Sequence, residues 1–176
     1  MAVIRIGILG AGTMGAAHAA AYAGLPEVEV VGVFARDEAR ARSVAELCGA
    51  APFTDAAALI GHVDVEAVDV CLPSALHAAF VVLALEQGKH VFCESPLALR
   101  LDEARLMRDA ARRADRLLQV GLLMRSVGAY AHLRAAVASG THGRLLSLAT
   151  WRLGSYLRRD GPDRKTHYGD PSTELM

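Results

Sequence analysis

The sequence lacks an excess of charge of either sign, a long apolar run and any closely spaced pair of cysteines. Its 19 basic residues balance 19 acidic residues, so no net field attracts the chain to nucleic acid or to an anionic membrane. The start, MAVIRIG, lacks the basic and apolar succession of a signal peptide, and no apolar stretch is long enough to span a bilayer. We therefore expect a soluble, cytoplasmic protein whose partner is a small molecule.

The cysteines and histidines show no paired spacing. Cys48, Cys71 and Cys93 stand far apart, and two of them lie in apolar strand-like runs, which favours reduced thiols over disulfides. The histidines form no H-E-x-x-H motif, so the sequence predicts no metal site. With 53% hydrophobic and 22% charged residues, the composition is that of a globular chain with one full core and part of a second.

Strand-like and helix-like segments alternate regularly from residue 3 to about residue 121. The strand candidates are residues 3–9, 28–35, 52–55, 66–73, 89–96 and 117–121, with helical patterns between them. This order predicts parallel strands joined by right-handed crossovers, which is a Rossmann-type, doubly wound α/β sheet. Asp55 is expected to cap the helix at 56–60. Asp102, with Arg105 at the N3 position, is expected to cap the helix that follows the fifth strand.

The glycine loop after the first strand matches G-x-G-x-x-G and opens a helix. Gly10 permits a tight turn, Gly12 leaves the backbone open to a pyrophosphate, and Gly15 lets the helix lie close to the strand. The helix N-terminus adds unpaired N–H groups and partial positive charge. The predicted dinucleotide contacts in this loop are Gly10, Gly12, Thr13, Met14 and Gly15.

The tip of the second strand selects between the two nicotinamide dinucleotides, because a carboxylate there accepts hydrogen bonds from the ribose hydroxyl and repels a 2′-phosphate. The tip reads Ala35-Arg36-Asp37. Since Ala35 carries no carboxylate and Arg36 can bind a phosphate, the sequence predicts NADP over NAD. The alternative is that Asp37 reaches back to the ribose.

The alternation of strand-like and helix-like segments ends at Gly121. Residues 126–143 predict an amphipathic helix followed by a glycine turn, and residues 144–156 alternate as a strand of a different sheet would. We therefore expect a dinucleotide-binding domain at 1–121 and the start of an incomplete second α/β domain at 122–176. The strand near 144–153 would have an unpaired edge and an uncovered apolar face, which predicts a homo-oligomer.

Several blocks carry a family resemblance. From the glycine loop through "FTD" and residues 67–99 to "QVGLLMR" and "GTHGRLLSL", the sequence resembles the Gfo/Idh/MocA family, the glucose-fructose oxidoreductase and inositol dehydrogenase group. The resemblance implies an N-terminal Rossmann domain and a C-terminal α/β domain on an open antiparallel sheet. It also implies hydride transfer between a nicotinamide cofactor and a sugar, cyclitol or related alcohol or carbonyl substrate.

The resemblance also assigns residues. Pro73 and His77 match the family's loop after the fourth strand, beside the cofactor, and Glu94 matches the first position of its Glu-Lys-Pro motif. Ser95 stands where the family has lysine. That lysine lies near the nicotinamide and the reacting hydroxyl in the family, whereas a serine hydroxyl near its ordinary pKa does little proton removal. Ser95 and His77 are the candidate catalytic residues, and Lys89, which matches "GKHV" before the strand, is expected to be structural.

Two hypotheses of different class follow. The first is an NAD(P)-dependent oxidoreductase chain that is descended or cut from a longer enzyme, since the family's Asp and His residues on a later helix lie past Met176. The second is a non-catalytic NADP-binding module or pseudoenzyme, motivated by Ser95. In a third alternative, hydride transfer proceeds and the substrate or water supplies the proton.

Overall fold

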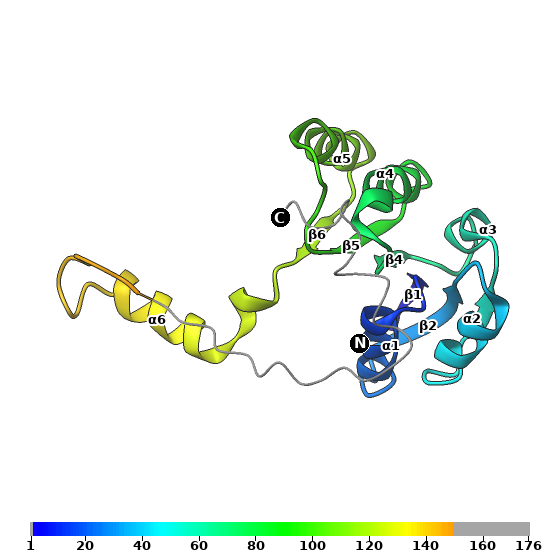
Figure 1. Cartoon of the computed structure of the whole chain (residues 1–176), viewed down its shortest axis with the longest axis horizontal. Helices are drawn as coiled ribbons and strands as arrows, with labels where there is room; N and C mark the ends of the chain where they lie inside the picture. The colour runs from blue at the N-terminus through cyan, green and yellow to red at the C-terminus, as the bar shows by residue number, and fades with distance from the viewer. Residues whose placement is uncertain (1, 150–176) are drawn as a thin grey trace, which may run out of the picture. The chain divides into compact units, whose positions relative to one another are not determined.

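The computed structural model of the chain describes residues 2–149, which form a six-stranded parallel sheet flanked by helices (Figure 1). The strands are β1 (Ile4–Leu9), β2 (Val28–Phe34), β3 (Ala51–Phe53), β4 (Ala67–Val70), β5 (His90–Glu94) and β6 (Leu118–Gly121). The helices are α1 (Thr13–Tyr22), α2 (Glu38–Ala45), α3 (Ala56–Ile60), α4 (His77–Glu86), α5 (Leu101–Ala114) and α6 (Gly128–Ala138). Two short 3-10 helices are η1 (Ser74–Leu76) and η2 (Leu123–Ser126).

The strand order is β3-β2-β1-β4-β5-β6, and every neighbouring pair is parallel. This is the doubly wound Rossmann order that the alternation of segments predicts. Two crossovers build outward from β1 in one direction, and the chain then returns to the other side of β1 with β4. The order therefore reverses between β1 and β4.

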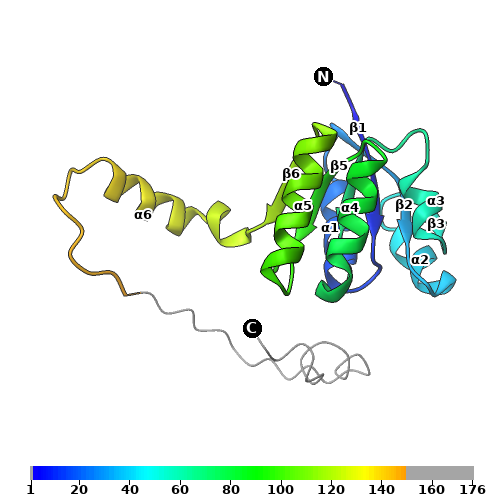
Figure 2. The same ribbon diagram turned by 90° about the horizontal axis from the view of Figure 1, so that it is seen from above.

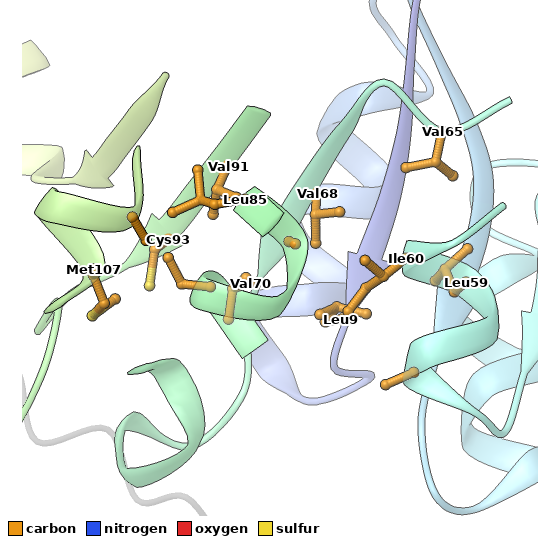
Figure 3. Packing of buried hydrophobic residues seen from close by; sticks show 14 of the residues in the cluster. Leu9, Leu59, Ile60, Val65, Val68, Val70, Leu85, Val91, Cys93 and Met107 are labelled. Carbon is orange, nitrogen blue, oxygen red and sulfur yellow. The ribbon is translucent and has the colours of Figure 1, made fainter. Parts of the chain in front are cut away.

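Both faces of the sheet are covered, which explains why the strands read as continuous apolar runs. On one face, α1 and α2 pack Ala19 and Val44 against Ile8 of β1. On the other face, α3, α4 and α5 supply the larger cluster, in which Leu59 and Ile60 lie close to Leu9 of β1 (Figure 3). Figure 2 shows α4 and α5 side by side on this second face, with α1 behind the sheet.

The N-cap of α3 agrees with the prediction from the sequence, whereas the N-cap of α5 does not. Asp55 caps α3 as predicted, because its carboxylate accepts from the N–H groups of Ala57 and Ala58 at 2.8 and 3.3 Å. The predicted cap at Asp102 is wrong. The N-cap of α5 is Arg100, in an extended conformation, and the guanidinium of Arg100 holds the Asp102 carboxylate at 3.0 Å inside the first turn. Asp102 still contributes there, since a carboxylate in the first turn complements the helix dipole.

The segment after β6 forms η2 and α6, and a turn with positive φ at Gly140 and Gly143 follows. A helix and a glycine turn are what the sequence predicts here. Residues 144–149 are irregular, so the strand predicted over them is wrong, because none of the described residues pairs with this segment as a strand needs. The rest of that predicted strand lies outside the described residues.

Contacts along the chain group it into two units, Met1–Ala131 and His132–Met176. The first unit holds the whole parallel sheet. Among residues 2–149, no helix combines the length and the apolar character needed to cross a bilayer.

Candidate functional site

The candidate site lies at the carboxyl edge of the sheet, where the strand order reverses. Because all strands are parallel, the segments that follow β1, β2, β4 and β5 emerge at the same edge (Figure 1). Ligands of open α/β sheets bind in the crevice at such a switch point. The sequence-predicted cofactor residues all come from these four segments.

The glycine loop connects β1 to α1, and its three glycines have different surroundings. Gly10 has a φ of +116°, and a Cβ there would lie 2.5 Å from the carbonyl oxygen of Cys71. A Cβ at Gly15 would overlap the carbonyl oxygen of Gly10. By contrast, a Cβ at Gly12 would meet nothing within 4 Å. Gly10 and Gly15 are therefore required by the fold itself, whereas Gly12 faces open space.

The N-terminus of α1 has the features of an anion site. Gly12 is its N-cap and provides no side-chain hydrogen bond, and the first turn contains no acidic residue. Thr13 and Met14 of that first turn are exposed. The first N–H groups of a helix have no partner within the helix and carry the positive end of its dipole. This end of α1 can therefore bind a phosphate group through the main chain.

The tip of β2 places Arg36 and Asp37 in different roles. The carboxylate of Asp37 accepts a hydrogen bond from the N–H of Arg40 at 3.1 Å and so caps α2. Arg36 is exposed and, within residues 2–149, makes no side-chain hydrogen bond. The guanidinium of Arg36 is therefore available to a ligand, while the Asp37 carboxylate is engaged at a helix terminus.

The loop after β4 brings Pro73 to the surface and His77 into the interior. His77 is only 1% exposed. Its Nδ1 lies 2.9 Å from the carbonyl oxygen of Pro96, and its Nε2 lies 2.8 Å from that of Leu72. The imidazole therefore fastens the loop after β4 to the loop after β5. This is the geometry of a positioning residue, and the structure shows no open path from its ring to a substrate; a direct role for His77 stays a prediction.

The end of β5 carries Glu94 and Ser95. One oxygen of Glu94 accepts from the N–H of Ser95 at 3.1 Å, and the other lies 3.3 Å from Nε2 of His18. Ser95 is exposed, and its hydroxyl makes no hydrogen bond with the described residues. Lys89 does not replace the missing lysine, because its ammonium donates to the carbonyl oxygens of His62 and Val65 at 3.0 and 2.7 Å. The prediction that Lys89 is structural is confirmed.

Sequence reasoning missed a polar cluster behind the glycine loop. Nδ1 of His18 lies 2.8 Å from Oδ2 of Asp69, and the hydroxyl of Tyr22 donates to the same oxygen at 2.9 Å. The thiol of Cys71 lies 3.2 Å from His18 Nδ1 and 3.4 Å from Asp69 Oδ1. The one signal in the sequence is the carboxylate of Asp69 in the middle of an otherwise apolar strand, since such a buried charge requires partners.

The buried carboxylate governs the protonation of its neighbours. Its hydrogen bond with His18 raises the pKa of the imidazole above its ordinary value, although burial opposes this shift. Burial, with Asp69 nearby, raises the pKa values of Tyr22 and Cys71 well above their ordinary ranges. At neutral pH the phenol and the thiol therefore keep their protons. On the opposite face of the sheet, burial raises the pKa of Cys93 to about 12.

The sheet order and the glycine loop together define a dinucleotide-binding Rossmann domain. The chain belongs to the Gfo/Idh/MocA family, since the pattern of this family, an oxidoreductase family with an NAD-binding Rossmann fold, matches residues 4–122.

Similar proteins include levoglucosan dehydrogenase of Pseudarthrobacter phenanthrenivorans, which is 31% identical over 88% of this chain and 41% of its own length. Inositol 2-dehydrogenase of Rubrobacter xylanophilus is 37% identical over 84% of this chain and 43% of its own. Among solved structures, the 3-ketoreductase KijD10 of Actinomadura kijaniata in complex with NADP superposes with a TM-score of 0.74 at 30% identity, over 80% of this chain and 45% of that one. The chain thus spans less than half the length of these relatives.

Proposed function

We propose that this chain binds a nicotinamide dinucleotide at the carboxyl edge of its sheet. The observation that carries the proposal is the open space at Gly12 beside the uncapped N-terminus of α1. The pyrophosphate would lie against the main chain of residues 12–15, where no side chain intervenes. Pro73 and Glu94, from neighbouring strand ends, would line the nicotinamide side. Family membership over residues 4–122 supports this assignment.

A calorimetric titration with NADPH tests the proposal on the chain as it stands. We expect saturable binding of one equivalent. The Gly12→Ala variant should bind at least about tenfold more weakly, because its methyl group occupies the space where the pyrophosphate approaches the main chain. Gly128→Ala is the matched control, since a Cβ at Gly128 also meets nothing within 4 Å and lies outside the loop. Absence of binding to either dinucleotide by the unmodified chain would refute the proposal.

NADP is the preferred dinucleotide in this proposal. Arg36 offers a guanidinium at the tip of β2, and the carboxylate of Asp37 is engaged as the cap of α2. Solved structures similar to this chain include complexes with NADP and with NADH, so the preference rests on the tip residues of this chain. Arg36→Ala should lower the ratio of NADP to NAD affinity, whereas Arg113→Ala, an exposed arginine on α5, should not. An unchanged ratio in Arg36→Ala would contradict the preference.

The reaction we propose for this protein is hydride transfer to or from a sugar, cyclitol or related alcohol or carbonyl substrate. The named relatives are dehydrogenases of levoglucosan and of inositol and a 3-ketoreductase. The dinucleotide supplies or accepts the hydride when bound. Glu94 and Ser95 stand at the motif beside it, and His77 holds the loops after β4 and β5 in register. Because the Ser95 hydroxyl is a weak acid, the substrate or water is the proton donor in this proposal.

A non-catalytic NADP-binding module is the second candidate, and Ser95 is the observation that favours it. Loss of NADPH absorbance in the presence of a panel of sugars and small carbonyl compounds separates the two candidates, and turnover by the 176-residue chain would eliminate the module. Ser95→Lys, made in a chain extended through a complete second sheet, tests the serine itself. A higher rate would show that Ser95 limits the activity, and an unchanged rate would show that serine suits the chemistry of this protein.

We further propose that residues 122–176 begin a second domain and that the chain self-associates through it. Large apolar side chains are exposed there, and Leu146 is 82% exposed. Sedimentation should detect a species larger than the monomer. A strictly monomeric, sharply melting species would contradict the proposal.

A further inference from the structure

Three side chains with metal-binding atoms meet behind the glycine loop. His18 comes from the second turn of α1, Asp69 from β4, and Cys71 from the residue after β4. The imidazole nitrogen, the carboxylate oxygen and the thiol sulfur all lie within 4.8 Å of one another. The three residues are brought together because β4 lies beside β1, the strand that leads into α1. We propose that they form a binding site for a zinc ion.

The donor set fits zinc. Imidazole nitrogen, thiolate sulfur and carboxylate oxygen are its three common ligand types, at about 2.0–2.1, 2.3 and 2.0–2.2 Å respectively. Ligand atoms at those distances around one tetrahedral ion lie about 3.3–3.7 Å apart. Here Nδ1 of His18 lies 2.8 Å from Oδ2 of Asp69 and 3.2 Å from the sulfur of Cys71. The sulfur lies 3.4 Å from the other carboxylate oxygen, Oδ1. With Oδ2 as the ligand, the nitrogen–oxygen and nitrogen–sulfur pairs need to separate by about half an ångström or less, and the ion replaces the protons that the donors now share.

The charge of the cluster also favours a cation. Asp69 is 1% exposed, and Glu94 approaches the other side of the same imidazole at 3.3 Å. In the described part of the chain, no lysine or arginine pairs with either carboxylate. A divalent ion with the Cys71 thiolate, the Asp69 carboxylate and neutral His18 forms a group of zero net charge, which lowers the cost of burying the carboxylate.

The surroundings supply the supporting hydrogen bonds that zinc sites use. A histidine that binds zinc through one nitrogen commonly donates its other N–H to a carboxylate. His18 would bind through Nδ1, and its Nε2 already lies 3.3 Å from Oε1 of Glu94. The ligating carboxylate is held in turn, because the Tyr22 hydroxyl donates to Asp69 at 2.9 Å. Glu94 and Tyr22 are thus positioning residues for the proposed ligands.

The test is a zinc titration of the chain after dialysis against a chelator, followed by competition with a chromophoric zinc indicator. We expect one equivalent to bind with micromolar or tighter affinity. Cobalt at the same site should show visible d–d bands of a tetrahedral ion and a thiolate-to-cobalt charge-transfer band in the near ultraviolet. Neither measurement requires the dinucleotide, so this inference and the proposed function fail or succeed separately.

Variants locate the site. Cys71→Ser and His18→Gln should each weaken binding at least tenfold. Glu94→Ala should weaken it by about ten- to a hundredfold, because it removes the acceptor of the supporting hydrogen bond. Cys48→Ser and His62→Gln are the matched controls, since both side chains lie outside the cluster, and they should bind as the unmodified chain does.

Two results would overturn the inference. The first is the absence of saturable binding of one equivalent by the unmodified chain, in which case the cluster is held by hydrogen bonds alone. The second is a zinc affinity that is as high in Cys71→Ser and His18→Gln as in the two control variants. Should those variants fail to fold, the cobalt spectrum of the unmodified chain decides, because a bound ion without a thiolate charge-transfer band excludes Cys71 as a ligand.

Discussion

Substitution of Gly15, the third glycine of the loop, tests the structural role of this motif apart from its role in binding. A Cβ at Gly15 would overlap the carbonyl oxygen of Gly10 and lie 2.9 Å from its carbonyl carbon. Overpacking costs about 1–3 kcal/mol where flexible side chains can adjust. Here the opposing atoms are main chain, in a loop whose Gly10 has a φ of +116°. We therefore expect Gly15→Ala to lower the free energy of unfolding by at least about 3 kcal/mol.

Thermal and urea unfolding measure this effect. For a chain of this size, about 3 kcal/mol corresponds to a fall in Tm of about 6–12 °C. Gly12→Ala is the internal comparison, because its Cβ meets nothing within 4 Å, and its stability should change by less than about 1 kcal/mol. The two variants should thus separate: Gly15→Ala loses stability, and Gly12→Ala loses only dinucleotide affinity. Equal melting temperatures for Gly15→Ala and the unmodified chain would refute the steric reasoning.

Three further predictions concern the core and the buried titratable groups. Leu59→Ala removes a fully buried side chain and should cost about 2–5 kcal/mol in urea unfolding, whereas the half-exposed Leu47→Ala should cost less than about 1 kcal/mol. The pair with Asp69 raises the pKa of His18 above 6.5, so its stabilisation is complete below pH 6.5 and is lost as the pH rises through the raised value. In the presence of a chelator, the difference in free energy of unfolding between the unmodified chain and His18→Gln should become smaller as the pH rises through this value. A difference that does not change with pH would contradict the pairing of His18 with Asp69. Cys93, with a pKa of about 12, should react with iodoacetamide only on unfolding, and mass spectrometry that finds it modified before Cys48 would contradict its burial.

The sheet could be predicted from the sequence because its signals are local. Each strand is a short apolar run that ends at a turn, and the glycine loop fixes which strand precedes the first helix. The start of α5 was harder to predict, since both Arg100 and Asp102 stand near it. The ion pair between them holds Asp102 within the first turn. A preference for acidic N-cap residues, applied to one residue at a time, does not take into account that Arg100 binds the carboxylate of Asp102.

The candidate site was predictable only where it follows strand ends. Gly12, Arg36 and Glu94 could be placed at one edge because parallel strands share their carboxyl ends. The contact between His18 and Asp69 joins residues 51 positions apart and depends on the angle at which α1 crosses the sheet. No periodicity encodes that angle, and the spacing of histidines along the chain therefore indicated no metal site.

The electrostatic balance at the strand ends connects the cofactor edge to the proposed zinc site. Asp69 and Glu94 both face His18, and the imidazole is the only cationic partner of these carboxylates within residues 2–149. Ser95, beside Glu94, is neutral where the resembling motif has lysine, so the chain adds no ammonium at this position. Two carboxylates then share one imidazole, and the cluster has a net negative charge even when His18 is protonated. A divalent ion on the far side of that imidazole compensates this charge, which is why the substitution at position 95 and the zinc site are consistent features of the same chain.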